Sequence, residues 1–95
     1  MMLIKQEQKE REGEFYMEEE GIKLAIMTYS IADDGLMIIN HTEVDDSLRG
    51  KKVGYNLVSN AVELAREKNF KILPLCSFAK SVFDKKGDEW KDVLR

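Results

Sequence analysis

The sequence has very few of the residues that cross-link or break a chain. Its 95 residues include one cysteine, Cys76, and one proline, Pro74. A single cysteine excludes an internal disulfide, which is the usual support of small secreted domains. The apolar start, Met-Met-Leu-Ile, is far too short for a signal peptide or a membrane span. We therefore expect a cytoplasmic protein.

The chain also lacks an excess of positive charge. Its 15 lysine and arginine residues face 18 aspartate and glutamate residues, which gives a formal net charge of -3. This balance provides no general reason to expect nucleic acid or an anionic membrane as a partner, so any anion site must be local. With 43% hydrophobic residues and no repeat or linker, residues 1–95 are expected to form a single domain.

The first half of the chain has the alternating pattern of β-strands. The strongly charged run at residues 5–14 favours a solvated strand edge or a loop. Residues 14–30 predict two strands that turn at Gly21, and the second of them carries apolar side chains that suggest burial on both faces. Ala-Asp-Asp-Gly at 32–35 is typical of a tight hairpin and leads into a strand at 36–44. An antiparallel meander follows from this order.

The pattern then changes to helical spacing. Apolar residues three and four apart predict a helix over residues 53–68, with Asn69 as its stop. Residues 70–76 predict a short buried strand in which Pro74 indicates a bulge or an edge position. Ser77 is then expected to cap a second helix that ends at Gly87.

This order of elements predicts an α+β fold. A helix that connects two strands makes them parallel, so the sheet is mixed: an antiparallel meander followed by a parallel β-α-β crossover, with two helices in all. The tail with Trp90 and Val93 is expected to pack back on the domain.

Three cations, Arg49, Lys51 and Lys52, lie directly before the predicted helix 53–68. The amino end of a helix carries unpaired N–H groups and partial positive charge, so cations are unfavourable there unless an anion is bound among them. A glycine-containing loop between a strand and a helix is a general way to hold phosphate. The alternative is an ordinary turn with a solvated charge run. The Walker and dinucleotide glycine patterns are both absent.

The segment VDDSLRGKKVGYNLVSNAVELAREKNFKIL resembles the acyl-CoA-binding core of the GNAT N-acetyltransferase superfamily. The loop of that core has the form Arg/Gln-x-x-Gly-x-Gly/Ala, and its backbone amides hold the CoA pyrophosphate. Arg49 and Gly54 match the ends of this motif, whereas Lys52 lies where the motif has glycine. The segments NHTEV and CSFAK are similar to those of the very short stand-alone members, the YjdJ type.

The resemblance implies a GNAT-like fold with acetyl-CoA or CoA as its ligand and acyl donor. It places the contacts to this ligand at Val44, Leu48, Arg49, Gly50, Lys51, Lys52, Val53 and Gly54. We expect Gly54 to leave room for the pyrophosphate, so that a branched side chain there would weaken binding most. Lys52 is expected either to cost affinity or to add a phosphate contact.

Acetyl transfer to an amine requires a base for the amine and a donor for the thioester oxygen. The resemblance implies a backbone donor near Glu43 and Val44. Strand alternation puts His41 and Glu43 on one face, so both are candidates for the base, directly or through water. The alternatives are a structural histidine and a surface carboxylate.

Cys76 is a further catalytic candidate. Where the family often has a tyrosine as general acid toward the thiolate, this chain has Phe83, which cannot donate a proton. Cys76 follows a strand and precedes a helix, a position that favours thiolate, so it could take the acetyl group and pass it on. The alternative is a small buried apolar residue. No metal-ligand cluster or serine triad is suggested.

The resemblance also shows what this chain lacks. Family members have two helices between their first strands that wall the acceptor site, and here only the charged run at residues 5–14 stands there. An open site suits a protein side chain or a polyamine as the amine acceptor. We therefore expect an acetyltransferase that is a monomer or weak homodimer. The alternative functions are a non-catalytic acyl-CoA-binding module and, less favoured, a subunit that needs a partner.

Overall fold

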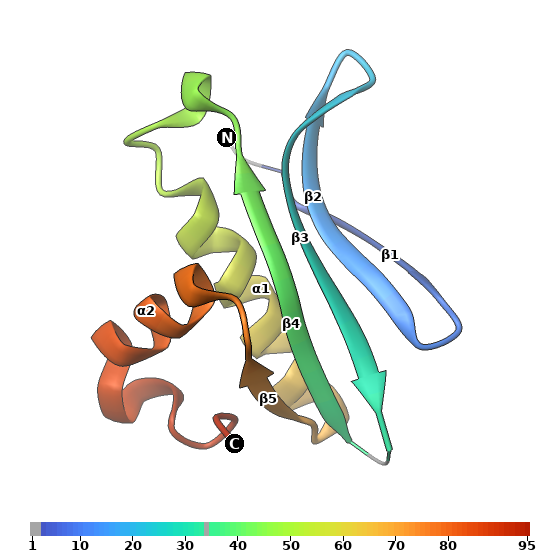
Figure 1. The fold of residues 1–95 in the computed structure, drawn as a ribbon, viewed down its shortest axis with the longest axis vertical. Coiled ribbons are helices and arrows are strands. Elements are labelled where there is room, and N and C mark those ends of the chain that lie inside the picture. The colour runs from blue at the N-terminus through green and yellow to red at the C-terminus, as the bar shows by residue number, and fades with distance from the viewer. Residues whose placement is uncertain (1–2, 34) are drawn as a thin grey trace.

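The computed structural model describes residues 3–33 and 35–95. It contains a five-stranded sheet in the order β1-β2-β3-β4-β5 (Figure 1). The strands are β1 (Lys5–Lys9), β2 (Glu12–Glu19), β3 (Ile22–Ala32), β4 (Leu36–Val44) and β5 (Lys71–Pro74). The first four pair antiparallel, and β5 pairs parallel to β4. The predicted mixed sheet is confirmed.

Two α-helices follow the meander, α1 (Val53–Lys68) and α2 (Ser77–Lys86), together with two short 3-10 helices, η1 (Asp46–Leu48) and η2 (Gly87–Trp90). Helix α1 has the predicted bounds, and Asn69 ends it in the left-handed conformation. Gly87 ends α2 as expected. The prediction that Ser77 caps α2 is wrong, because Cys76 has the extended backbone of the cap position and Ser77 is already helical.

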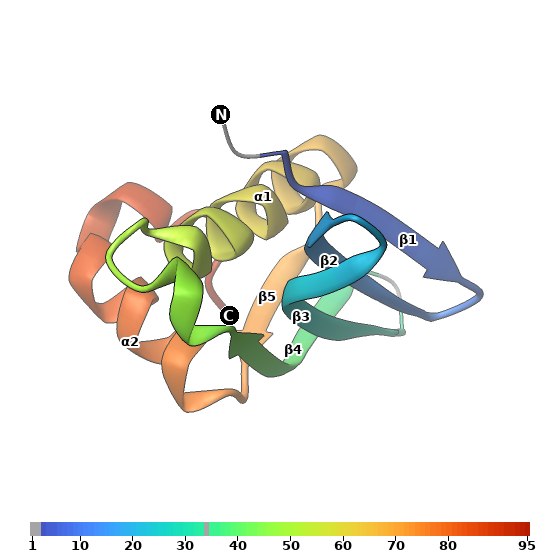
Figure 2. The ribbon, with the colours of Figure 1, turned by 90° about the horizontal axis from the view of Figure 1, so that it is seen from above.

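Both helices lie on one side of the sheet (Figures 1 and 2). Helix α1 crosses this face and α2 packs beside it near β5. The largest side chains that are fully buried between these layers come from β3, β4, β5 and α1: Tyr29, Met27, Met37, Ile39, Leu57, Ile72, Val53, Val58 and Val62. In the described part of the chain no helix covers the opposite face, which we call the uncovered face.

Strand β3 is buried on the side that the helices cover. Ala25, Met27 and Tyr29 are buried against the helices, whereas Ile26 and Thr28 on the uncovered face are only half-buried. The expectation that this strand is buried on both faces is therefore wrong. The apolar residues on its second side lie on the bare surface of the sheet.

The charged run forms the edge of the sheet. All five residues of β1 are exposed, as expected of a solvated edge strand. Two of its glutamines bond the Tyr29 hydroxyl: Gln6 Nε2 donates to it at 2.7 Å, and it donates to Gln8 Oε1 at 2.9 Å. The Tyr29 ring crosses Gly13, where a Cβ would lie 2.5 Å from the ring. Besides its backbone pairing with β2, the edge strand is thus joined to the core by the Tyr29 hydroxyl.

The C-terminal tail returns to β5, as predicted. Trp90 and Val93 are buried. The amide of Ile72 donates to the carbonyl of Val93 at 2.6 Å, and the amide of Arg95 donates to the carbonyl of Ile72 at 2.9 Å. The tail therefore forms an isolated parallel bridge beside β5.

A β-bulge divides β4. Tyr29 pairs with Ile39 and Thr28 pairs with His41, so Asn40 is the extra residue. Before the bulge, Met37 and Ile39 face the helices. After it, Thr42 and Val44 pair with the buried residues Met27 and Ala25 and therefore share their face. His41 and Glu43 consequently lie on the uncovered face.

Candidate functional site

Strands β4 and β5 separate halfway along β4. Their parallel pairing ends at Ile39 and Pro74. The amides of Leu75 and Cys76 both donate to the carbonyl of Ile39, at 3.1 and 3.2 Å, and the chain then turns into α2. From His41 to Val44 the edge of β4 that faces α2 therefore has no strand beside it.

A groove of about 580 Å³ lies between this end of β4, the loop before α1, and α2. Its lining residues are Val44, Leu48, Arg49, Gly50, Lys52, Val53, Gly54, Tyr55, Phe78, Val82, Lys85 and Lys86. Four of these are basic and none is acidic, in a chain with a net charge of -3. The groove therefore combines an apolar floor with local positive charge. This local charge agrees with the expectation that any anion site must be local.

Two contacts fix the loop before α1. Asp45 accepts a hydrogen bond from the amide of Ser47 at 2.9 Å and so caps η1, while the buried side chain of Leu48 anchors the loop. Helix α1 begins without a side-chain cap. The amides of its first turn, at Val53, Gly54 and Tyr55, have no bond within the helix and stay available to an anion.

Seven of the eight residues predicted to contact CoA line this groove, and Lys51 is exposed outside its lining. Arg49 is bonded to Asp46, with Nη2 to Oδ1 at 3.2 Å. The side chain of Lys52 has no hydrogen-bond or ion-pair partner among residues 3–33 and 35–95.

Lys52 has the left-handed conformation, with φ 59°. This conformation is unfavourable for a residue with a Cβ and free for glycine, which the motif has at this position. We expect Lys52→Gly to stabilise the fold by up to about 1 kcal/mol in urea denaturation. The same change removes a cation from the groove, so we expect CoA binding to weaken by roughly threefold to tenfold.

Asn69→Gly is the matched control for this substitution. Asn69 also has φ 59° at the end of α1, but asparagine tolerates this conformation and the residue does not line the groove. The control should change stability less and leave CoA binding unaltered. Tighter CoA binding by Lys52→Gly would show that the lysine obstructs the ligand.

The ring of Phe78 occupies the space beside the Cα of Gly54. A Cβ at Gly54 would lie 2.4 Å from Cζ of the Phe78 ring. Phe78 is 40% exposed, so its outer side forms the wall of the groove. The expectation that Gly54 leaves its space to the pyrophosphate therefore needs revision, because an aromatic ring occupies that space in this structure.

Cys76 is partly buried at the start of α2, and its Sγ lies 3.4 Å from the Thr42 hydroxyl. Burial raises the pKa of the Cys76 thiol, but hydrogen bonds from Thr42 and from the amides of Ala79 and Phe78 outweigh it, so the pKa is lowered overall. The side chain makes no capping bond to the helix. The amides at the amino end of α2 would donate to a negatively charged sulfur, so they favour the thiolate over the thiol.

His41 and Glu43 lie together but apart from the cysteine. His41 Nε2 is 3.6 Å from Glu43 Oε1, and the two side chains are 62% and 72% exposed. They lie on the uncovered face, whereas Thr42 and Cys76 lie on the helix side of β4. In the part of the chain that the structure describes, no hydrogen bond or ion pair joins His41 to Cys76.

Phe83 is a core residue. It is 3% exposed and its ring meets the edge of Trp90 at a centroid distance of 5.3 Å. Its contacts are those of core packing, and its side chain has no proton to donate.

The sequence did not point to five residues of the groove, namely Tyr55, Phe78, Val82, Lys85 and Lys86, nor to Thr42, which contacts Cys76. Helical spacing was the available signal for α2, since residues 78, 82, 85 and 86 lie on one face of a helix. For Thr42 the signal was strand alternation, which places it on the side of β4 opposite His41.

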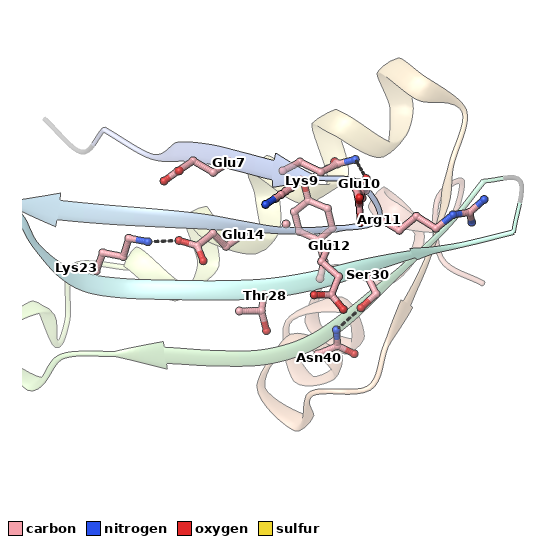
Figure 3. A pocket seen from close by; sticks show the side chains of 13 residues that line it. Glu7, Lys9, Glu10, Arg11, Glu12, Glu14, Lys23, Thr28, Ser30 and Asn40 are labelled. Atoms are coloured by element: carbon pink, nitrogen blue, oxygen red, sulfur yellow. Dashed lines mark hydrogen bonds and ion pairs between the residues drawn. The ribbon is translucent and has the colours of Figure 1, made fainter.

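A larger hollow, of about 1110 Å³, lies on the uncovered face beside the β1–β2 hairpin (Figure 3). Its charged residues have both signs, and an ion pair between Lys23 and Glu14 crosses it. Asn40 donates to Ser30 at 2.9 Å along its wall. It contains neither the cysteine nor the histidine. We place the site at the smaller groove because uncompensated positive charge and free amides meet there, and because Phe78, two residues after Cys76, is part of its wall.

The model of the GCN5-related N-acetyl-transferase family matches residues 14–93. The chain belongs to this family. It is similar to a solved GCN5-like protein from Staphylococcus aureus, with 40% identity and a TM-score of 0.75 over 96% of this chain and 87% of that chain. No curated protein matches it.

More distant structures share the GNAT fold. The ribosomal-protein-S18-alanine N-acetyltransferase from Escherichia coli matches with 15% identity and a TM-score of 0.68, over 84% of this chain and 54% of that chain. An aminoglycoside N-acetyltransferase in complex with CoA matches with 14% identity and a TM-score of 0.62, over 83% and 69%. Acetyl-CoA is the donor that is typical of the GNAT family.

Two further findings concern the described residues of this GNAT protein. None of its helices is both long and apolar enough to cross a membrane. No three histidine, cysteine, aspartate or glutamate side chains in residues 3–33 and 35–95 are grouped so that they could hold a metal ion.

Proposed function

We propose that the protein binds acetyl-CoA in the groove between the loop before α1 and α2, and transfers the acetyl group to an amine. The observation that carries this proposal is the composition of the groove, which has basic side chains, unbonded helix amides and an apolar floor. Val44 of β4 and Phe78 of α2 both line it, and Cys76, two residues before Phe78, contacts Thr42 of β4.

The residues fit such a donor in three ways. Arg49, Lys52 and the first-turn amides of α1 would hold the pyrophosphate, and Lys51 would act from outside the groove by its charge. The apolar part of the acetyl-CoA would contact Val44, Leu48, Gly50 and Val53. The free backbone near Glu43 and Val44 would donate to the thioester oxygen.

Cys76 would receive the acetyl group first. Its thiolate attacks the acetyl carbon, a new carbon–sulfur bond forms, and CoA leaves as a thiolate, so no proton donor is needed at the position of Phe83. The lowered pKa of the Cys76 thiol supports this step. The acceptor nitrogen then attacks the acetyl carbon, and the Cys76 sulfur leaves as a thiolate.

His41 and Glu43 would accept the amine proton in the second step. Both are exposed on the uncovered face, and both are separated from Cys76 by β4, so a water molecule is the expected carrier. The uncovered face leaves room for a large acceptor, which favours a protein side chain or a polyamine in the cytoplasm. The protein would work as a monomer or weak homodimer.

The test is mass spectrometry after incubation with acetyl-CoA, at a mildly acidic quench pH that preserves thioesters. We expect a fraction of the protein to carry one acetyl group on Cys76, and Cys76→Ala to bind CoA normally but to acetylate an added amine more slowly. Uptake should reach half its maximal rate at a lower pH than acetylation of free cysteine, because the pKa of Cys76 is lowered.

Several controls separate the alternatives. CoA should raise the melting temperature, and an equal concentration of phosphate should do so only weakly. Absence of a thioester together with normal turnover by Cys76→Ala would assign direct transfer, with His41 or Glu43 as the base. Binding without any transfer to amines would assign the second candidate, a non-catalytic acyl-CoA-binding module, which Phe83 in place of a proton donor favours.

A further inference from the structure

Two lysines in the last turn of α2, Lys85 and Lys86, line the same groove that Arg49 and Lys52 line from the loop before α1. Lys86 is held in place: its Nζ lies 2.9 Å from Glu89 Oε2, 5.1 Å from the centre of the Tyr55 ring and 5.2 Å from that of Trp90. The side chain of Lys85 is exposed and has no hydrogen-bond or ion-pair partner among the described residues.

Cations in the last turn of a helix have an ordinary structural explanation, since they interact favourably with the helix dipole. Two observations go beyond it. Tyr55 comes from α1 and fixes Lys86 across the boundary between the helices, which a dipole contact does not require. The groove that both lysines line has four basic residues and no acidic one, although acidic residues outnumber basic ones in the chain.

CoA carries two separate anionic groups, the pyrophosphate and the 3′-phosphate of the ribose. The loop before α1 and the last turn of α2 provide two separate cationic walls. We propose that Lys85, positioned beside the fixed Lys86, binds the ribose 3′-phosphate and so makes the protein select CoA over dephospho-CoA. This inference rests on the proposed function.

The experiment compares the dissociation constants of CoA and dephospho-CoA by calorimetry. We expect the parent protein to bind CoA roughly tenfold more tightly, which corresponds to one charge-assisted contact of about 1.4 kcal/mol. Lys85→Gln should reduce this preference to within about threefold by weakening CoA binding alone. Lys85→Gln with Lys86→Gln should abolish it.

Lys80→Gln is the matched control, because Lys80 is an exposed lysine of the same helix outside the groove. It should leave the preference unchanged. Equal weakening of both ligands by Lys85→Gln, or equal binding of both by the parent protein, would overturn the inference. Failure of the parent protein to bind either ligand would instead refute the proposed function. Melting curves of each variant check that the fold persists.

Discussion

Replacing Gly54 with valine should reduce CoA binding more than tenfold and destabilise the fold by about 1–3 kcal/mol. The Cβ of the new side chain would lie 2.4 Å from the Phe78 ring, so the ring must move. Because Phe78 walls the groove, its displacement alters the space that the ligand needs. Calorimetry with CoA and urea denaturation measure the two effects.

A double-mutant cycle tests the cause. In the parent protein Gly54→Ala should destabilise, because even one methyl group meets the ring. After Phe78→Ala the same change should stabilise by up to about 1 kcal/mol, since alanine is the better helix former. The expected reversal of sign is the decisive outcome. If Gly54→Ala costs the same in both backgrounds, Phe78 is not what constrains this position.

Replacing Trp90 with alanine should cost about 3–5 kcal/mol of unfolding free energy. Trp90 is 4% exposed, stacks with Tyr55 at 5.8 Å and meets Phe83 at 5.3 Å, so it joins η2 to both helices. In a domain of this size the melting temperature should fall by roughly 15 °C or more. Thermal and urea unfolding give the values.

Leu94→Ala is the control for this change, because Leu94 is 38% exposed in the same tail and should cost much less. Trp90→Phe should recover part of the lost stability. A loss below about 1 kcal/mol for Trp90→Ala would mean that the tail contributes little to the core, contrary to the burial seen here.

Local patterns predicted much of this fold. Helix α1 has its predicted bounds because apolar residues recur at helical spacing and Asn69 adopts the left-handed stop. His41 and Glu43 share a face because they stand two residues apart in one strand. The cations at the amino end of α1 predicted an anion site at the loop before it, and this loop lines the groove.

What could not be predicted depends on contacts between distant segments. The apolar residues of β3 suggested two buried faces, but their pattern does not say that only one layer of helices exists. Phe78 reaches Gly54 only because α2 packs beside α1. The strand predicted at residues 70–76 covers only Lys71–Pro74. It ends there because the amides of Leu75 and Cys76 both donate to the carbonyl of Ile39, so the pairing with β4 stops. None of these contacts leaves a local signal.

The bulge at Asn40 divides β4 into two halves that present opposite sets of side chains to the core. A strand repeats every two residues, so one extra residue exchanges the faces for everything that follows it. The first half supplies Met37 and Ile39 to the core, while the second half turns His41 and Glu43 to the solvent. His41 and Glu43 are therefore free to vary with the chemistry of the acceptor, whereas Thr42 and Val44 between and after them stay bound to the packing on the helix side.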